Sequence, residues 1–119
     1  MIVGLGIDLV EITRIEEAMQ NPRFQERILT RKERDYCITP FHVAGRWAAK
    51  EAVAKAVGVH LGWQEVEILP NDMGVPTAQI TSMHFDPIRF RIHVSITHER
   101  THAAAVAVLE KLVYQAPVP

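Results

Sequence analysis

The stretch FHVAGRWAAKEAVAKAVG, residues 41–58, has the composition of one long helix. It is rich in alanine, contains no proline and ends at a glycine, and this combination favours a helix with a sharp stop. Wound at about 100° per residue, it has an apolar arc of about half its circumference, interrupted only by Glu51 and Lys55. Arg46 and Lys50 fall outside this arc. We therefore expect the apolar arc to face the core, with Glu51 and Lys55 on the buried side.

Two interpretations of Glu51 and Lys55 are open at this point. Residues four positions apart on an exposed helix face form ion pairs that contribute about 0.2–0.5 kcal/mol. A carboxylate and an ammonium among alanines and a tryptophan, however, cost free energy unless something pairs with them. Partly buried charges of this kind collect at functional sites. The two residues are either a surface ion pair or part of a site.

The size and composition of the chain indicate one domain. It has 119 residues, of which 48% are hydrophobic and 23% charged, and we place the domain at 1–113 with a loose, proline-containing tail at 114–119. No apolar run has the length of a membrane span, and the first residues lack the pattern of a signal peptide. Cys37 is the only cysteine. No internal disulfide can form, so we expect a cytoplasmic protein with no membrane partner.

Basic residues are concentrated in one part of the chain, although the net charge is only −1. Arg14, Arg23, Arg27 and Arg31 all belong to this part. Such a surface is either merely solvated or attracts an acidic protein, which it would steer toward the chain without base recognition. No motif of a nucleic-acid reader accompanies the charge, so we expect no nucleic-acid partner.

The first residues, Met1–Leu9 (MIVGLGIDL), have the pattern of a β-strand. Alternation places Gly4, Gly6 and Asp8 on one face of that strand. Glycines inside a strand mark the close approach of a ligand or of another backbone. Asp8, at the end of this small-residue face, either meets a metal or a cation or only begins a turn.

The remaining pattern predicts an α+β fold, with one long helix and short helices packed on a small, mostly antiparallel sheet. Capping boxes and a proline predict short helices that begin after Thr13, at Pro22 and after Thr30. Alternating or apolar runs predict further strands at 63–69, 77–81, 91–97 and 102–109. The segment 82–90 fits neither pattern, because Pro87 disfavours a long helix there.

The segment His98-Glu99-Arg100-Thr101-His102 matches the H-E-x-x-H signature of zinc metallohydrolases. That chemistry needs both histidines on one face of a helix, with a third ligand downstream. Here the motif lies between two strand-like runs, where a turn is expected instead. A zinc hydrolase that uses His98, Glu99 and His102 is therefore an alternative that requires a helix at this position.

Several segments together resemble the holo-acyl-carrier-protein synthases, the short 4′-phosphopantetheinyl transferases. The resembling segments are GLGIDLVEITRI (4–15), FQERILTRKE (24–33), AGRWAAKEAVAKAVG (44–58), VEILPNDMGVP (66–76) and VSITHE (94–99). The resemblance implies the phosphopantetheinyl transferase fold and an enzyme that moves 4′-phosphopantetheine from coenzyme A to a serine of apo acyl carrier protein. The other product is adenosine 3′,5′-bisphosphate. A relative that binds coenzyme A or the carrier without catalysis is a further alternative.

The resemblance also implies roles for residues of the long helix and the first strand. Asp8 and Glu51 would bind Mg²⁺, which suits a metal that prefers few carboxylates together with phosphate and water oxygens. Lys55 would stabilise charge on the pyrophosphate leaving group. Glu51 or a water molecule would act as general base.

Coenzyme A and the carrier would contact further residues. In this family the active sites lie between the protomers of a homotrimer. The expected coenzyme A contacts are Lys55, Arg46, Gly58, Pro76, Ser95 and His98. The expected carrier contact is Arg14, and charge alone adds Arg23 and Arg27. Shortened connections at 37–42 and 58–63 depart from the family pattern, so we expect the nucleotide contacts to differ there.

Overall fold

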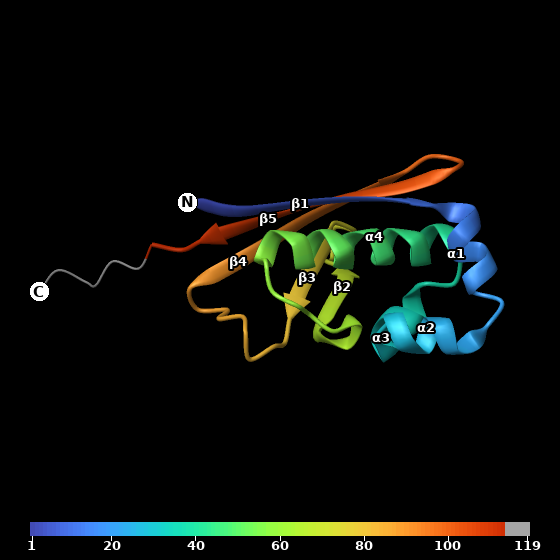
Figure 1. Ribbon diagram of the computed structural model, residues 1–119, viewed down its shortest axis with the longest axis horizontal. Helices are drawn as coiled ribbons and strands as arrows, with labels where there is room; N and C mark the ends of the chain where they lie inside the picture. Colours follow the sequence, from blue (N-terminus) through green and yellow to red (C-terminus); the bar gives the residue numbers. More distant parts are fainter. Residues whose placement is uncertain (114–119) are drawn as a thin grey trace, which may run out of the picture.

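Two antiparallel sheets and one long helix organise the computed structural model, which describes residues 1–113. The larger sheet has the strand order β1-β5-β4, and the smaller sheet is the β2-β3 hairpin. The helix α4 runs along the larger sheet (Figure 1). The strands are β1 (Ile2–Glu11), β2 (Val66–Pro70), β3 (Pro76–Ile80), β4 (Phe90–His98) and β5 (His102–Lys111). The predicted α+β architecture is confirmed.

Four α-helices and one 3-10 helix complete the described residues. They are α1 (Ile12–Ala18), α2 (Pro22–Ile28), α3 (Arg31–Tyr36), α4 (Pro40–Val57) and the 3-10 helix η1 (Trp63–Glu65). Asn21 caps α2 through its side chain, and Thr30 and Glu33 form both bonds of the predicted capping box at α3. The prediction for Thr13 is wrong, because β1 continues to Glu11 and the helix begins directly after it.

The long helix has the ends that its sequence predicts, within one residue. Thr39 caps α4 by accepting a hydrogen bond from the backbone N–H of His42 at 3.2 Å. Pro40 occupies the first turn, where a missing N–H costs nothing. Gly58 ends α4 in the left-handed region, with φ 78°, which a residue without Cβ adopts readily.

The two glycines of β1 allow α4 to lie directly on this strand. A Cβ at Gly4 would be 2.0 Å from the carbonyl oxygen of Ala56, and one at Gly6 would be 1.9 Å from that of Ala52. Both distances are far below van der Waals contact. The predicted close approach is confirmed, and the approaching backbone is that of α4. This contact places the next residue of the same face, Asp8, beside the helix.

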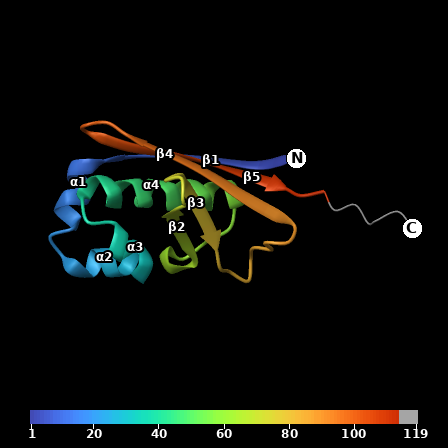
Figure 2. The same cartoon turned by 180° about the vertical axis from the view of Figure 1, so that it is seen from behind.

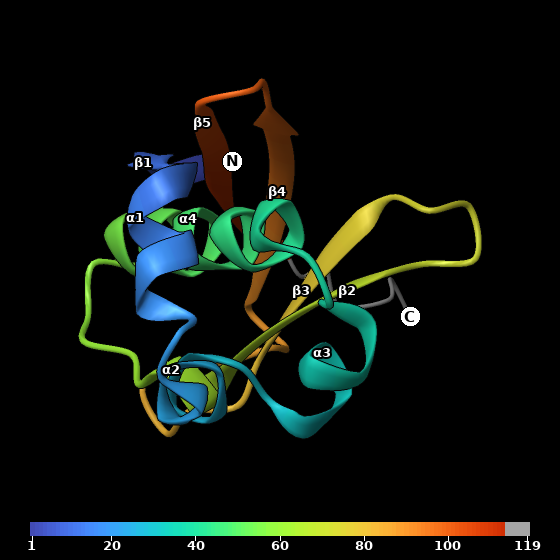
Figure 3. The same ribbon diagram turned by 90° about the vertical axis from the view of Figure 1, so that its right-hand side faces the viewer.

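The predicted buried face of α4 is confirmed for Val43, Ala44, Ala48 and Ala52, which are fully buried, but the prediction for the charged residues is wrong. Arg46 and Lys50 are buried, with 7% and 3% exposure, whereas Lys55 is exposed and Glu51 is half-buried. Viewed end-on, α4 has the larger sheet on one side and the layer of α2 and α3 on the other (Figure 3). On this second side Trp47 packs against Trp63, with ring centroids 4.5 Å apart. The helical wheel assumes a single core face, whereas a helix covered from two sides has two.

Smaller differences concern two connecting segments. Residues Trp63–Glu65 form η1 rather than the start of a strand, so β2 begins at Val66. Seen from behind, the connection from β3 to β4 follows an irregular path (Figure 2), and residues 82–89 contain turns but no helix. The tail predicted at 114–119 lies outside the described residues. Within 1–113, no helix is long and apolar enough to cross a membrane.

Candidate active site

The contact between β1 and α4 brings Asp8 and Lys55 together. The Nζ atom of Lys55 lies 3.3 Å from Oδ1 of Asp8 and donates to the carbonyl oxygen of Ile7 at 2.9 Å. The Lys55 side chain is 55% exposed and that of Asp8 is 17% exposed, so solvent and ligands reach the pair. The ion pair of Lys55 with Glu51, one of the two interpretations that the sequence left open, does not form, because Lys55 turns to β1 instead.

Glu51 lies four residues before Lys55, about 6 Å along the axis, and on the same side of α4. Within residues 1–113 its carboxylate is half-buried and accepts no hydrogen bond. Asp8, which pairs with Lys55, and Glu51 are therefore two carboxylates on the same side of α4. Two carboxylates suit Mg²⁺, which completes its octahedron with phosphate and water oxygens.

A second cluster lies on the other side of α4, around a cavity of about 180 Å³. Its polar members are Arg46 and His42 of α4, Tyr36 of α3 and His98 of β4. The Nε atom of Arg46 donates to the carbonyl oxygen of Ile68 at 3.3 Å, and its guanidinium carbon lies 4.9 Å from the centre of the Tyr36 ring. These contacts hold the guanidinium in place at the cavity that Arg46 lines. The arrangement suits an anionic group beside an aromatic wall.

The predicted site residues therefore fall into two groups within one chain. Lys55 follows Arg46 by nine positions in α4, so the two side chains leave the helix in opposite directions. Asp8, Glu51, Lys55 and the exposed Gly58 lie on one side of α4, and Arg46, Pro76 and His98 lie on the other. Ser95 joins neither group, because it is exposed on the opposite face of β4 from His98.

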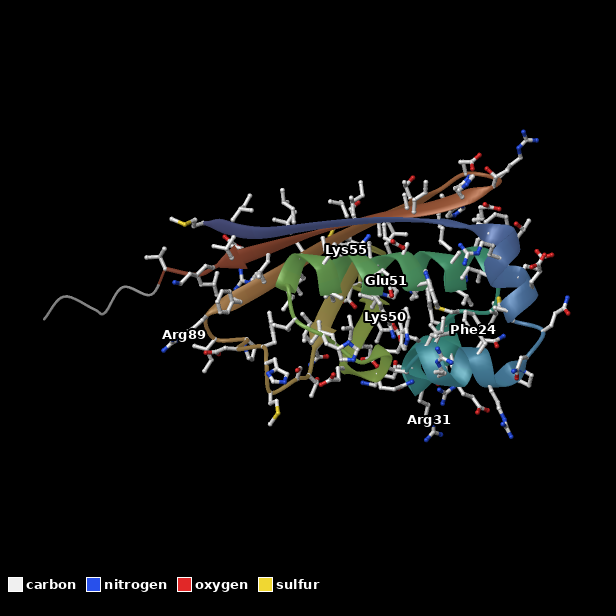
Figure 4. All side chains as sticks on the ribbon, in the orientation of Figure 1. Phe24, Arg31, Lys50, Glu51, Lys55 and Arg89 are labelled. Atoms are coloured by element: carbon white, nitrogen blue, oxygen red, sulfur yellow. The ribbon has the colours of Figure 1, made fainter. Side chains whose placement is uncertain are left out.

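A buried ion pair next to the site escaped the sequence analysis. Lys50 donates to Oε1 of Glu33 at 2.6 Å and to the carbonyl oxygens of Ile28 and Trp63 at 2.7 and 2.8 Å. The second carboxylate oxygen of Glu33 accepts from the backbone N–H of Ile68 at 2.7 Å. Burial lowers the pKa of Lys50, and Glu33 opposes this shift. Figure 4 shows Lys50 on the α2 and α3 side of α4, and Lys55 on the β1 side.

The H-E-x-x-H segment forms a tight hairpin turn between β4 and β5. Glu99 accepts hydrogen bonds from the backbone N–H groups of Thr101 and His102 at 2.8 and 2.7 Å, and from the Thr101 hydroxyl. These bonds lower the pKa of Glu99 to about 2. In residues 1–113, no three His, Cys, Asp or Glu side chains are grouped to hold a metal. The helix that the zinc alternative requires is absent from this segment.

The arginines expected to contact a carrier protein lie on the short helices before α4. Arg14 belongs to α1, and Arg23 and Arg27 belong to α2. All three are exposed, as is Arg31 at the start of α3, which Figure 4 shows pointing away from the sheet. None forms an ion pair within the described residues. Their charges are available to an acidic surface.

Comparison with known proteins identifies the class of protein to which this fold belongs, the phosphopantetheinyl transferases. Residues 4–108 match the family model of the 4′-phosphopantetheinyl transferase superfamily. A holo-[acyl-carrier-protein] synthase from an Exiguobacterium species is 40% identical, over 93% of this chain and 94% of its own. The chain belongs to the holo-[acyl-carrier-protein] synthase family.

Solved structures of this family have the same fold. A holo-(acyl-carrier-protein) synthase from Bacillus anthracis, in complex with CoA (3′,5′-ADP), superposes with a TM-score of 0.83 at 37% identity. The comparison covers 94% of this chain and 99% of that one. The Helicobacter pylori enzyme, in complex with coenzyme A, gives a TM-score of 0.81 at 29% identity, over 89% of this chain and 99% of its own.

Proposed function

We propose that this chain transfers 4′-phosphopantetheine from coenzyme A to a serine of apo acyl carrier protein, with Mg²⁺ bound by Asp8 and Glu51. The serine oxygen forms a bond to the phosphorus that carries the pantetheine. The bond from that phosphorus to the bridging pyrophosphate oxygen breaks, and adenosine 3′,5′-bisphosphate leaves. The serine proton passes to a general base, Glu51 or a water molecule. The contact of Asp8 with Lys55, in a chain whose relatives bind coenzyme A, carries this proposal.

The residues around Asp8 suit displacement at phosphorus, where positioning and charge neutralisation dominate. When bound, Mg²⁺ would supply positive charge to the pyrophosphate oxygens. Lys55 lies 3.3 Å from Asp8, so its ammonium can reach the same oxygens and stabilise the charge that grows on the leaving group. Lys55 is exposed enough to move from Asp8 to a ligand, and its contact with the Ile7 carbonyl keeps it beside the site.

We place the nucleotide end of coenzyme A in the cavity of Arg46, Pro76 and His98, although this cavity lies across α4 from Asp8. One coenzyme A molecule meets both groups if the two groups come from neighbouring copies. The site would then be composite, with the pyrophosphate on Asp8, Glu51 and Lys55 of one protomer and the nucleotide in the cavity of the next.

The outer face of the larger sheet supports such an assembly. Leu5, Ile7 and Leu9 of β1 are 67%, 69% and 65% exposed, and Val106 of β5 lies opposite Ile7 in the register. A continuous apolar strip of this kind is typical of a surface that another chain covers. The strip lies on β1, which also carries Asp8. We therefore propose a homotrimer closed through β1 and β5, with active sites between protomers.

The exposed arginines of α1 and α2 support docking of an acidic carrier on that side of the molecule. Opposite charges steer association and add specificity, and exposed charges of this kind are screened by salt. We place the reaction in the cytoplasm, because the single cysteine, Cys37, is buried as a free thiol. Burial raises its pKa to about 11, which keeps the sulfur protonated and out of the chemistry.

Mixing two inactive variants tests the composite site. Glu51→Gln removes one charge from the group beside Asp8, and His98→Glu places a negative charge at the cavity on the other side of α4. Each variant alone should be nearly inactive in the transfer of phosphopantetheine. After subunit exchange, random mixing in a ring leaves about a quarter of the sites with both intact groups. Activity should then return toward that level.

Two controls accompany the mixing experiment. Mixing either variant with itself should restore no transfer activity. Both variants should unfold at nearly the temperature of the unaltered chain. A mixture that stays as inactive as its components, although its subunits exchange, would contradict a site shared between copies. Near-normal turnover of Glu51→Gln would contradict the assignment of Glu51 to the metal.

A further inference from the structure

His42 lies in the first turn of α4 and lines the cavity with Arg46 and His98. Its ring stacks on that of Tyr36, with centroids 5.4 Å apart and an interplanar angle of 26°. Tyr36 therefore contacts both His42 and Arg46, and holds an imidazole and a guanidinium at the same cavity. The first turn is also the positive end of the helix dipole, which favours an anion there.

The two nitrogens of His42 have different surroundings. The Nδ1 atom is buried and has no hydrogen-bond partner among the described residues. A buried N–H without an acceptor is rare, and an unmatched acceptor is better tolerated. The proton of the neutral ring therefore belongs on Nε2, the one nitrogen left for the cavity. Burial lowers the pKa of His42, and Arg46 and His98 lower it further, which favours the neutral ring with its one N–H donor.

Coenzyme A carries two separate phosphate groups, and the proposed function assigns only one of them. The pyrophosphate contains the bond that breaks, so it belongs with Asp8 and Lys55. The ribose 3′-phosphate is at the adenosine end, which the proposed function places in the cavity. There, Arg46 supplies positive charge, and Tyr36 and Phe41 supply aromatic surface.

We propose that His42 is a specificity-determining residue of this chain: its Nε2–H donates to the ribose 3′-phosphate of coenzyme A, and Tyr36 positions the ring for this contact. The inference rests on the proposed function. His42 would thereby discriminate coenzyme A from 3′-dephospho-coenzyme A, which lacks that phosphate. A hydrogen bond to a charged group is worth a factor of about ten to a hundred in binding.

The test compares kcat/KM for coenzyme A with kcat/KM for 3′-dephospho-coenzyme A, in the presence of apo carrier protein. His42→Phe keeps an aromatic ring on Tyr36 but removes both nitrogens, and should lower the ratio of the two values about ten- to hundredfold. His42→Gln keeps a donor near the position of Nε2 and should retain part of the preference. The matched control is His84→Phe, at an exposed position in the connection between β3 and β4, which should leave the ratio unchanged.

Two variants of Tyr36 test its positioning role by the same ratio. Tyr36→Phe keeps the ring and should keep the preference, whereas Tyr36→Leu removes the ring and should lower it. A ratio unchanged in His42→Phe would overturn the proposal. Equal losses of kcat/KM with both substrates would also overturn it, because a merely structural residue behaves in this way.

Failure of this inference is distinguishable from failure of the proposed function. If the unaltered chain does not transfer phosphopantetheine from coenzyme A, the proposed function fails. The role of His42 is then tested by calorimetry, with adenosine 3′,5′-bisphosphate compared with adenosine 5′-monophosphate. Weaker binding of the bisphosphate alone in His42→Phe would support the contact. Unchanged binding of both nucleotides would overturn it.

Discussion

Replacing Lys50 by methionine tests how much the buried ion pair stabilises the fold. The side chains of Lys50 and Glu33 are 2% and 0% exposed, and Lys50 donates to three acceptors. Lys50→Met keeps the length of the side chain but leaves the Glu33 charge without its cation, and removes the donor from the carbonyls of Ile28 and Trp63. Removing one partner of a buried pair costs about 3–5 kcal/mol. We expect a loss of this size in the free energy of unfolding.

The hydrogen bonds from the backbone N–H groups of Thr30 and Ile68 keep the Glu33 carboxylate in its buried position. We therefore expect the loss of stability in Lys50→Met to come mainly from this unpaired charge. Adding Glu33→Gln to Lys50→Met removes that charge and should recover more than about 1 kcal/mol, because the two side chains share one network. Urea unfolding of both single variants and the double variant measures this coupling. All samples are compared at one protein concentration, because an oligomer unfolds with a concentration-dependent midpoint. A loss below about 1 kcal/mol in Lys50→Met, or strictly additive losses, would refute the reasoning.

Three further predictions concern other parts of the molecule. Gly6→Ala puts a Cβ 1.9 Å from the Ala52 carbonyl oxygen. It should lower the free energy of unfolding by at least about 1–3 kcal/mol through overpacking, and reduce transfer activity by moving β1 from α4. Unchanged stability by urea unfolding would contradict this. The pKa of Glu99 lies near 2, below its ordinary 4.5. Its stabilisation of the β4–β5 turn should therefore be complete above pH 4.5 and lost as the pH falls through about 2. A Glu99 carboxyl that titrates near pH 4.5 by NMR would contradict this. Arg27→Ala should raise KM for the carrier protein but leave KM for coenzyme A unchanged. This effect on the carrier KM should shrink as salt is added, and a carrier KM that does not depend on salt would count against charge steering.

The sequence predicted the elements of this fold well where the signal is local. The capping box at Thr30 and the terminal glycine of α4 depend on residues within one turn, and both are present. The glycines of β1 indicated a close approach because only a residue without Cβ permits one. The helix start predicted after Thr13 was wrong, because hydrogen bonds to β5 extend the first strand to Glu11. Pairing with a distant strand leaves no local signal in the sequence.

The second buried side of α4, which carries Arg46 and Lys50, was missed although a signal existed. Val53 and Val57 lie beside Arg46 and Lys50 on the helical wheel, so the helix is apolar almost all round, as in a helix buried from two sides. The partner of Lys50, Glu33, comes from another helix, and the wheel of α4 contains no information about it.

The two groups of candidate site residues were predicted with unequal completeness. Asp8, Glu51 and Lys55 are candidates from the sequence alone, through the glycine face of the first strand, the interrupted apolar pattern of the long helix and a family resemblance. The cavity across α4 is assembled from α3, α4, the β2–β3 hairpin and the end of β4, and Tyr36 and His42 carry no motif that marks them. Their role depends on tertiary contacts, which a single sequence does not specify.

The central claim, transfer of 4′-phosphopantetheine to a carrier protein, is tested most directly by mass spectrometry. The chain is incubated with coenzyme A, Mg²⁺ and apo acyl carrier protein, and the intact carrier is weighed, with Glu51→Gln and a reaction containing EDTA as controls. We predict that the carrier gains the mass of one phosphopantetheine with the unaltered chain and gains almost none in either control. A carrier that keeps its mass with several apo carrier proteins, although the chain binds coenzyme A, would contradict the claim and favour a binding role without catalysis.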